Sequence, residues 1–68
     1  MFKKRLREAR KSAGLTQERM ADLLNISLYG YQKYELGQSM PTIDNLLKIS
    51  RILDVTTDYL LCNDTRAE

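Results

Sequence analysis

The sequence predicts an all-α protein built as a compact bundle of five short helices. Apolar residues recur at spacings of three and four in the longer candidate segments, as on one face of a helix. Ser or Thr precedes most of these segments, and Gly or Asn follows several of them, as helix caps do. No segment alternates polar and apolar residues for long enough to be a credible strand.

The first helix is expected over residues 2–13, with Gly14 as the signal that ends it. Its outer face is strongly basic, because residues 1–11 carry six Lys or Arg residues against the single Glu8. The whole chain has a net charge of only +2, so this basic end indicates an anionic partner, although a merely solvated helix face would look the same. The predicted apolar stripe consists of Phe2, Leu6, Ala9 and Ala13.

Residues 16–37 predict two helices joined by a tight turn. Thr16 can cap a helix over 17–24, and Asn25 tolerates the left-handed conformation in which such a helix ends. Ser27 can cap a second helix over 28–36, which Gly37 can terminate. A helix, a three-residue turn and a helix form the unit that places its second helix in the DNA major groove. The apolar face predicted for the first of these helices consists of Met20, Ala21, Leu23 and Leu24.

Two more helices are expected after a polar loop at 37–41. Thr42 can cap a helix over 43–53, and Thr56 can cap a shorter one over 57–62. We expect a domain at 1–63 and a polar tail at 64–68. The broad buried face predicted for the longer helix consists of Ile43, Leu46, Leu47, Ile49, Ser50 and Leu53.

Several short motifs, in this order and spacing, resemble the helix-turn-helix family of phage repressors, Cro proteins and Xre-type bacterial regulators. The motifs are L-T-Q-E, the turn N-I-S, Y-E-L-G and P-T-I-D-N-L-L-K-I, and the resemblance covers about residues 2–61. It implies a five-helix domain of the lambda-repressor-like type that binds double-stranded operator DNA, usually as a dimer. In that family Tyr31 and Tyr34 would face inward.

Four residues of the third helix are expected to point into the groove and read bases. Gln32 can make the paired hydrogen bonds that read adenine, and Lys33 can donate to guanine or to a phosphate. Leu28 offers apolar contact, for which a thymine methyl group is the natural partner, and Tyr29 can use its ring or its hydroxyl. The alternative for each is contact with a phosphate or with solvent only.

Phosphate contacts are expected from side chains at helix starts and in the loop after the third helix. Gln17 matches the family position that holds a phosphate, and a helix N-terminus favours an anion independently. The full set of expected phosphate contacts is Gln17, Ser27, Gln38, Ser39 and Thr42. The resemblance also implies a structural ion pair between Arg10 and Glu35, which would fix the orientation of the third helix.

Two residues depart from the family pattern. Gly30 lies inside the third helix, where it costs about 1 kcal/mol relative to Ala. Tyr31 occupies a position where a medium-sized aliphatic residue is usual. Local repacking is the favoured interpretation, and close approach of the backbone at Gly30 to DNA is the alternative.

The composition argues against an enzyme, a metal site and a membrane protein. There is no His, and the single Cys62 cannot form an internal disulfide. We therefore expect no cofactor, no metal and a cytoplasmic location. The family resemblance implies a nucleoid-associated regulator of bacterial or phage origin, most simply a repressor. A palindromic operator would require a homodimer, for which Leu61 and Cys62 are the interface candidates. The alternative is an antitoxin-like or accessory module that uses the same scaffold to bind a protein.

Overall fold

Five helices follow one another in the computed structural model, which describes residues 1–62. No residue in this range belongs to a β-strand, so the all-α prediction is confirmed. Residue 63 and the expected tail at 64–68 lie outside the described residues. The helices are α1 (Phe2–Ser12), α2 (Gln17–Leu24), α3 (Leu28–Leu36), α4 (Ile43–Leu53) and α5 (Thr57–Leu60).

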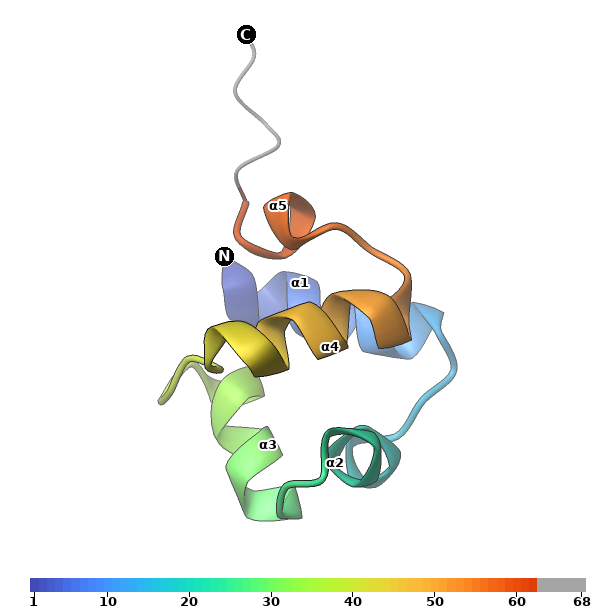
Figure 1. The fold of residues 1–68 in the computed structure, drawn as a ribbon, viewed down its shortest axis with the longest axis vertical. Helices are drawn as coiled ribbons and strands as arrows, with labels where there is room; N and C mark the ends of the chain where they lie inside the picture. Colours follow the sequence, from blue (N-terminus) through green and yellow to red (C-terminus); the bar gives the residue numbers. More distant parts are fainter. Residues whose placement is uncertain (63–68) are drawn as a thin grey trace, which may run out of the picture.

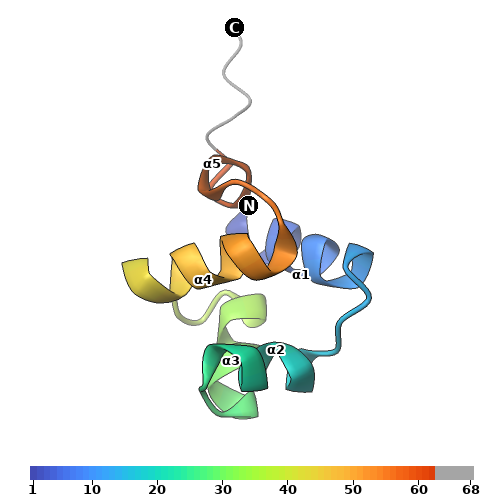
Figure 2. The ribbon, with the colours of Figure 1, turned by 45° about the vertical axis from the view of Figure 1, so that its right-hand side comes forward.

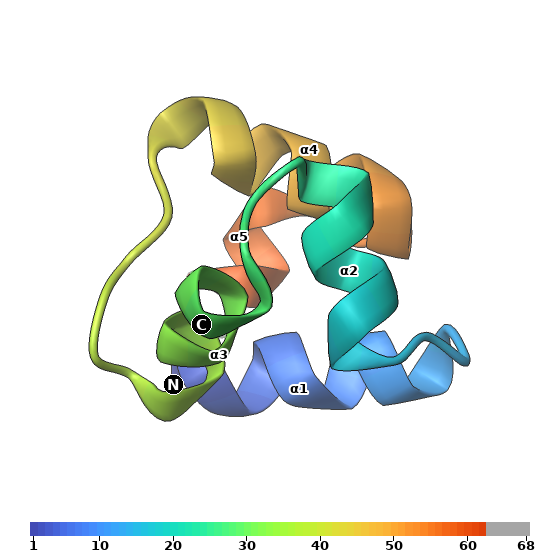
Figure 3. The same cartoon turned by 90° about the horizontal axis from the view of Figure 1, so that it is seen from below.

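The helices are arranged so that α2 and α3 lie at one end of the molecule and α5 at the other. In Figure 1, α1 and α4 cross the middle, and α5 packs on both of them. The turned view of Figure 2 shows the same order, with α2 and α3 together below α4. Seen from below, α2 and α3 present their connecting turn to the viewer (Figure 3). The helix-turn-helix unit therefore has one open side.

Four of the five helices begin with a hydroxyl cap, as the sequence predicts. In each, the side-chain oxygen accepts a hydrogen bond from the amide three residues later, at distances from 2.9 Å to 3.2 Å. Each cap satisfies one of the amides that a helix start leaves without an intrahelical partner. The capping residues are Thr16, Ser27, Thr42 and Thr56.

Left-handed residues set most of the helix ends. Asn25 (φ 59°) and Gly37 (φ 78°) terminate α2 and α3 as predicted. The expected ends of the first and last helices are wrong by one and two residues, because α1 ends at Ser12 and α5 at Leu60. Cys62 has a φ of 60°, a left-handed conformation that no right-handed helix can contain, so α5 stops before it.

The core consists of ten buried apolar side chains from all five helices. Tyr31 is completely buried (0% exposed) and meets Tyr34 edge to face, with the ring centroids 6.1 Å apart. This geometry is one that aromatic pairs prefer. The inward orientation expected for both tyrosines is therefore observed. The core residues are Leu6, Ala9, Met20, Ala21, Leu24, Tyr31, Tyr34, Ile49, Leu53 and Leu60.

Several residues expected in the core are exposed. Ile43 is 76% exposed because it lies in the first turn of α4, which projects beyond the rest of the bundle (Figure 2). Leu47, one turn later, is also exposed. Leu23 falls at the edge of the inner face of α2, and Ala13 lies beyond the end of α1. The apolar periodicity predicted the correct face of these helices but overestimated how much of that face is buried.

A contact between α1 and α5 joins parts of the chain that are far apart in sequence. Arg5 Nη1 donates a hydrogen bond of 2.7 Å to the carbonyl oxygen of Tyr59, 54 residues later. The guanidinium carbon also lies 4.6 Å from the centroid of the Tyr59 ring, a cation–π geometry. Arg5 therefore holds α5 against α1 through both the backbone and the ring.

Candidate nucleic-acid interface

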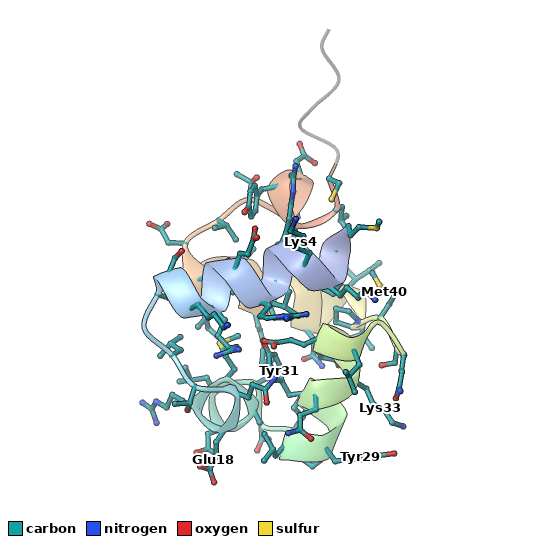
Figure 4. The ribbon with its side chains drawn as sticks, turned by 180° about the vertical axis from the view of Figure 1, so that it is seen from behind. Lys4, Glu18, Tyr29, Tyr31, Lys33 and Met40 are labelled. Atoms are coloured by element: carbon teal, nitrogen blue, oxygen red, sulfur yellow. The ribbon has the colours of Figure 1, made fainter. Side chains whose placement is uncertain are left out.

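The outer side of α3 carries three of the four residues expected to read bases. Tyr29 is 69% exposed, Leu28 is 39% exposed and Lys33 is half-buried. Figure 4 shows Tyr29 and Lys33 on this outer side, while Tyr31 turns inward toward α1 and α2. The Lys33 ammonium lies 4.8 Å from the centroid of the Tyr29 ring, which is a cation–π geometry.

The fourth candidate, Gln32, leans toward α2. Its Nε2 donates a hydrogen bond of 3.3 Å to Gln17 Oε1, and the side chain is half-buried. Gln17 Nε2 in turn donates to Glu35 Oε1 at 2.9 Å. The first residue of α2 and the middle of α3 are therefore joined through their side-chain amides.

Arg10 and Glu35, paired in the sequence analysis through the family resemblance, lie in contact. Arg10 Nε donates to Glu35 Oε2 at 2.6 Å, and Arg10 Nη2 donates to Glu35 Oε1 at 3.2 Å. Arg10 Nη1 also donates to the carbonyl oxygen of Leu15 at 2.8 Å. Both side chains are buried, so the pair is a fixed link between α1 and the end of α3.

Tyr31 is a further partner of this pair that sequence reasoning missed. Its hydroxyl donates to Glu35 Oε2 at 2.5 Å. The available signal was the spacing of four residues, which places Tyr31 and Glu35 on one face of a helix. Together with Gln17 and the two bonds from Arg10, the Glu35 carboxylate accepts four hydrogen bonds.

These contacts shift the pKa values of Arg10, Tyr31 and Glu35. Burial would raise the pKa of Glu35, but the hydrogen bonds from Arg10, Tyr31 and Gln17 outweigh it and hold that pKa below its ordinary value. Burial, and then the hydrogen bond to Glu35, raise the pKa of Tyr31 well above its ordinary value. The hydrogen bond to Glu35 raises the pKa of Arg10. At neutral pH the carboxylate is charged and the phenol is neutral.

A hollow of about 540 Å³ opens between α1 and the helix-turn-helix unit. Arg7 and Lys11 of α1 are exposed at its lining. Lys3 is also exposed, and its side chain lies beside Gly37 at the end of α3. A Cβ added to Gly37 would lie only 2.9 Å from Lys3 Cδ. We call Lys3, Arg7 and Lys11 the basic stripe; their spacing of four was the signal that the sequence analysis did not use. The complete lining is Arg7, Arg10, Lys11, Gln17, Gln32, Glu35 and Leu36.

The other expected phosphate contacts lie at the start of α3 and around the loop that follows it. The hydroxyls of Ser27 and Thr42 accept from their own helices, which leaves each O–H hydrogen available to an acceptor. Gln38 is exposed, and its backbone N–H donates to the carbonyl oxygen of Lys33. Ser39 is half-buried in the same loop.

The two candidates for a dimer interface, Leu61 and Cys62, directly follow α5 in the chain. Helix α5 lies at the end of the molecule away from α2 and α3 (Figure 1). Leu61 is 45% exposed. Cys62 is half-buried, and its Sγ lies 2.7 Å from the amino group of Met1.

Neither a membrane segment nor a metal cluster occurs in the described part of the chain. None of the helices in residues 1–62 has the length and apolarity needed to span a bilayer. Across the same residues, no three side chains of the Cys, Asp or Glu type gather as metal ligands would.

Comparison with known proteins identifies relatives over almost the whole chain. The helix-turn-helix family model matches residues 6–60. The chain is 51% identical over 61 residues to the SPbeta prophage-derived uncharacterized HTH-type transcriptional regulator YonR of Bacillus subtilis, covering 90% of this chain and 56% of that protein. It is 47% identical over 59 residues to the cryptic phage CTXphi transcriptional repressor RstR of Vibrio cholerae, covering 87% and 53%. The chain thus spans about half the length of these curated relatives.

The fold also matches that of a solved structure. The DNA-binding domain of the P22 C2 repressor superposes with a TM-score of 0.84 and 27% identity, covering 97% of this chain and 87% of that one. The family model, the relatives and the structural match all coincide with the helix-turn-helix geometry described above. The chain belongs to the helix-turn-helix family, together with these phage repressors and HTH-type transcriptional regulators.

Proposed function

We propose that this chain is a sequence-specific double-stranded DNA-binding domain that regulates transcription, most simply as a repressor, by placing α3 in the major groove. The observation that carries the proposal is the placement of the basic stripe beside the exposed side of α3. A groove-reading helix flanked by cations matches DNA, in which base edges lie between two phosphate backbones. The names of RstR and the P22 C2 repressor support the same function.

Each part of the surface has a role in this proposal. Leu28, Tyr29, Gln32 and Lys33 contact base edges, and the basic stripe contacts phosphates. Gln17, Ser27, Gln38, Ser39 and Thr42 supply further phosphate contacts. Because Lys and Arg displace counterions from DNA, the affinity should fall steeply as the salt concentration rises.

The proposed unit on DNA is a homodimer on a palindromic operator. One α3 offers only four candidates for base readout, and a good base contact gives only about 1–3 kcal/mol of discrimination. Two copies double the readout, with recognition helices about 34 Å apart. Leu61 and Cys62 are the proposed interface because they directly follow α5, the helix at the end of the molecule away from α2 and α3 (Figure 1). The proposed location is the cytoplasm, in association with the nucleoid.

Selection of bound duplexes from a random pool tests this function directly. A palindromic consensus is expected. Gln32→Ala and Lys33→Ala should each weaken binding to that consensus more than Glu18→Ala, which removes a side chain on α2 (Figure 4). The proposed readout is wrong if both α3 variants keep the wild-type affinity and the same preferred site.

Exposed apolar surface on α3 favours a second candidate function. Leu28 and Tyr29 could dock on a partner protein, so that the chain would act as an antitoxin-like or accessory module. Gel-shift competition at moderate salt separates the two functions. Equal competition by every duplex would favour docking, whereas strong competition by one sequence would favour an operator.

A further inference from the structure

Tyr29 and Lys33 lie one helical turn apart on the outer side of α3 and are in contact. Their spacing of four residues places them on the same face of the helix, where Figure 4 shows both side chains. The Lys33 ammonium lies 4.8 Å from the centroid of the Tyr29 ring. Tyr29 is 69% exposed, so most of its surface stays open beside the lysine. We call these two side chains the Tyr29–Lys33 pair.

The ammonium of this pair is suited to guanine. It carries three N–H donors and no acceptor, and the Tyr29 ring occupies one side of it. No carboxylate within residues 1–62 forms an ion pair with Lys33, so the remaining donors are available to DNA. Guanine offers two neighbouring acceptors in the major groove, N7 and O6. Adenine places a donor at N6, which an ammonium cannot use.

The ring of this pair is suited to a methyl group. Among the groups that the four bases present in the major groove, the C5 methyl of thymine is the one that prefers an apolar partner. A 5-methylcytosine carries the same methyl group at the same ring position. Because a ring gains contact area from the methyl group and none from a bare C5, it can distinguish pyrimidines by methylation.

The separation of the two groups determines which base pairs they reach together. Successive base pairs are about 3.4 Å apart along the duplex, and pairs two steps apart are separated by about 6.8 Å. The 4.8 Å between the ammonium and the ring centroid is closer to the first value. A guanine contacted by Lys33 and a methyl group contacted by Tyr29 therefore belong to neighbouring base pairs.

We infer that the Tyr29–Lys33 pair reads a guanine and a 5-methylpyrimidine on adjacent base pairs, and that 5-methylcytosine can replace thymine there; this inference rests on the proposed DNA-binding function. Tyr29 selects the methyl group with its ring, and Lys33 holds that ring in place while it contacts the guanine. Methylation of a cytosine at this step therefore raises the affinity of the chain for DNA.

The test measures two ratios of affinities on synthetic duplexes that carry the sequence selected by the wild-type protein. The base pair at which Lys33→Met loses its preference for guanine locates the step. The pyrimidine on each adjacent base pair is then varied, with thymine compared with deoxyuridine and 5-methylcytosine with cytosine. Each comparison changes only the methyl group. At one of the two adjacent pairs, both ratios should be about fourfold for the wild-type protein, as for the burial of one methyl-sized group.

Variants of the pair assign the effect to the ring. Tyr29→Ala should bring both ratios toward one, whereas Tyr29→Phe, which keeps the ring and removes the hydroxyl, should keep them. Lys33→Met retains the length of the side chain but not its charge. It should lower both ratios, because the ring is no longer held by the ammonium.

A control variant separates methyl reading from overall affinity. Gln38→Ala alters the loop after α3 and should weaken binding to all four duplexes by the same factor, so that the ratios stay unchanged. Thermal melts identify which variants are folded before their ratios are compared.

The outcomes distinguish this inference from the proposed function. The inference is overturned if both ratios are one for the wild-type protein, if Tyr29→Phe loses them, or if Lys33→Met keeps them in full. It is also overturned if Leu28→Ala removes the methyl preference while Tyr29→Ala does not, or if Lys33→Met loses preference for guanine at no base pair. In all these cases a selected palindrome would leave the proposed function standing. A wild-type protein that selects no sequence would remove the proposed function and the inference with it.

Discussion

Tyr31 donates a hydrogen bond of 2.5 Å to the carboxylate of Glu35, one turn further along α3, inside the protein. The Tyr31 phenol thus completes the hydrogen bonding of a buried charge. No buried side-chain nitrogen or oxygen lacks a partner within residues 1–62. The local repacking expected around Tyr31 stays a prediction, and the hydrogen bond to Glu35 gives the Tyr31 hydroxyl a partner inside the core.

The first prediction concerns the Arg10–Glu35 pair. Arg10→Met and Glu35→Leu should each destabilise the fold by about 3–5 kcal/mol, because each leaves a buried charge without its partner. The double variant should be less destabilised than the sum of the two single variants. Denaturant melts of all four proteins measure this coupling. Strictly additive losses would show that the pair contributes no interaction energy.

The second prediction concerns pH. The lowered pKa of Glu35 contributes stability that is present above about pH 4.3, the ordinary value, and lost as the pH falls through the folded value. The raised pKa of Tyr31 contributes stability that is present below about pH 10 and lost as the pH rises. Tyr31→Phe should therefore cost most between these limits, about 1.5–3 kcal/mol, as for a hydrogen bond to a charged group.

Urea melts of the wild-type protein and Tyr31→Phe at acid, neutral and alkaline pH measure this difference. Tyr34→Phe is the matched control, because the Tyr34 hydroxyl accepts a bond of 3.3 Å from the neutral Asn45 amide. Its cost should be smaller and should not diminish in acid as the cost of Tyr31→Phe does. An equal difference between wild type and Tyr31→Phe at every pH would contradict the assignment of charges.

The third prediction compares two glycines of the α3 region. Gly30→Ala should stabilise the protein by up to about 1 kcal/mol, because Ala is the better helix former. The added Cβ would lie 3.2 Å from Ser27 Oγ, so the Ser27 side chain would have to shift slightly. Capped helices with a side chain at the third helical position accommodate such a contact. Gly37→Ala should destabilise by about 1–2 kcal/mol, since Gly37 has a φ of 78°.

Thermal unfolding of the two variants checks this comparison. The expected shifts in melting temperature have opposite signs. A loss of stability in Gly30→Ala would mean that the Ser27 cap cannot adjust to the added methyl group.

The fourth prediction concerns assembly on DNA. Leu61→Lys should leave the fold intact, because Leu61 is 45% exposed, and should abolish cooperative binding of two copies to a palindrome. Ile43→Lys is the control, since it places the same charge on the exposed first turn of α4. Analytical ultracentrifugation with DNA gives the stoichiometry. Unchanged two-to-one binding by Leu61→Lys would exclude Leu61 from the interface.

The sequence predicted features whose cause is local. Thr16 and Ser27 cap helices, and Asn25 ends one, because a side chain or a backbone conformation acts within three residues of itself. These features gave the boundaries of α2, α3 and α4 correctly.

Features that depend on how helices meet were harder to predict. Ile43 fits the apolar period of α4, but its burial depends on whether another helix covers the first turn. The bond from Gln17 to Glu35 joins residues 18 positions apart, and no local pattern specifies it. Arg10 and Glu35 were paired only through the family resemblance, since their separation of 25 residues carries no periodic signal.

The contact of Arg5 with Tyr59 has a consequence for how the protein is made. A chain emerges from the ribosome with its N-terminus first, so Arg5 emerges well before Tyr59, its hydrogen-bond partner. The surface of α1 that packs against α5 stays uncovered by α5 while the next 54 residues are synthesised. The helix-turn-helix segment is complete in sequence well before this last contact can form. A nascent chain can therefore complete the fold of residues 1–62 only after α5 has emerged from the ribosome.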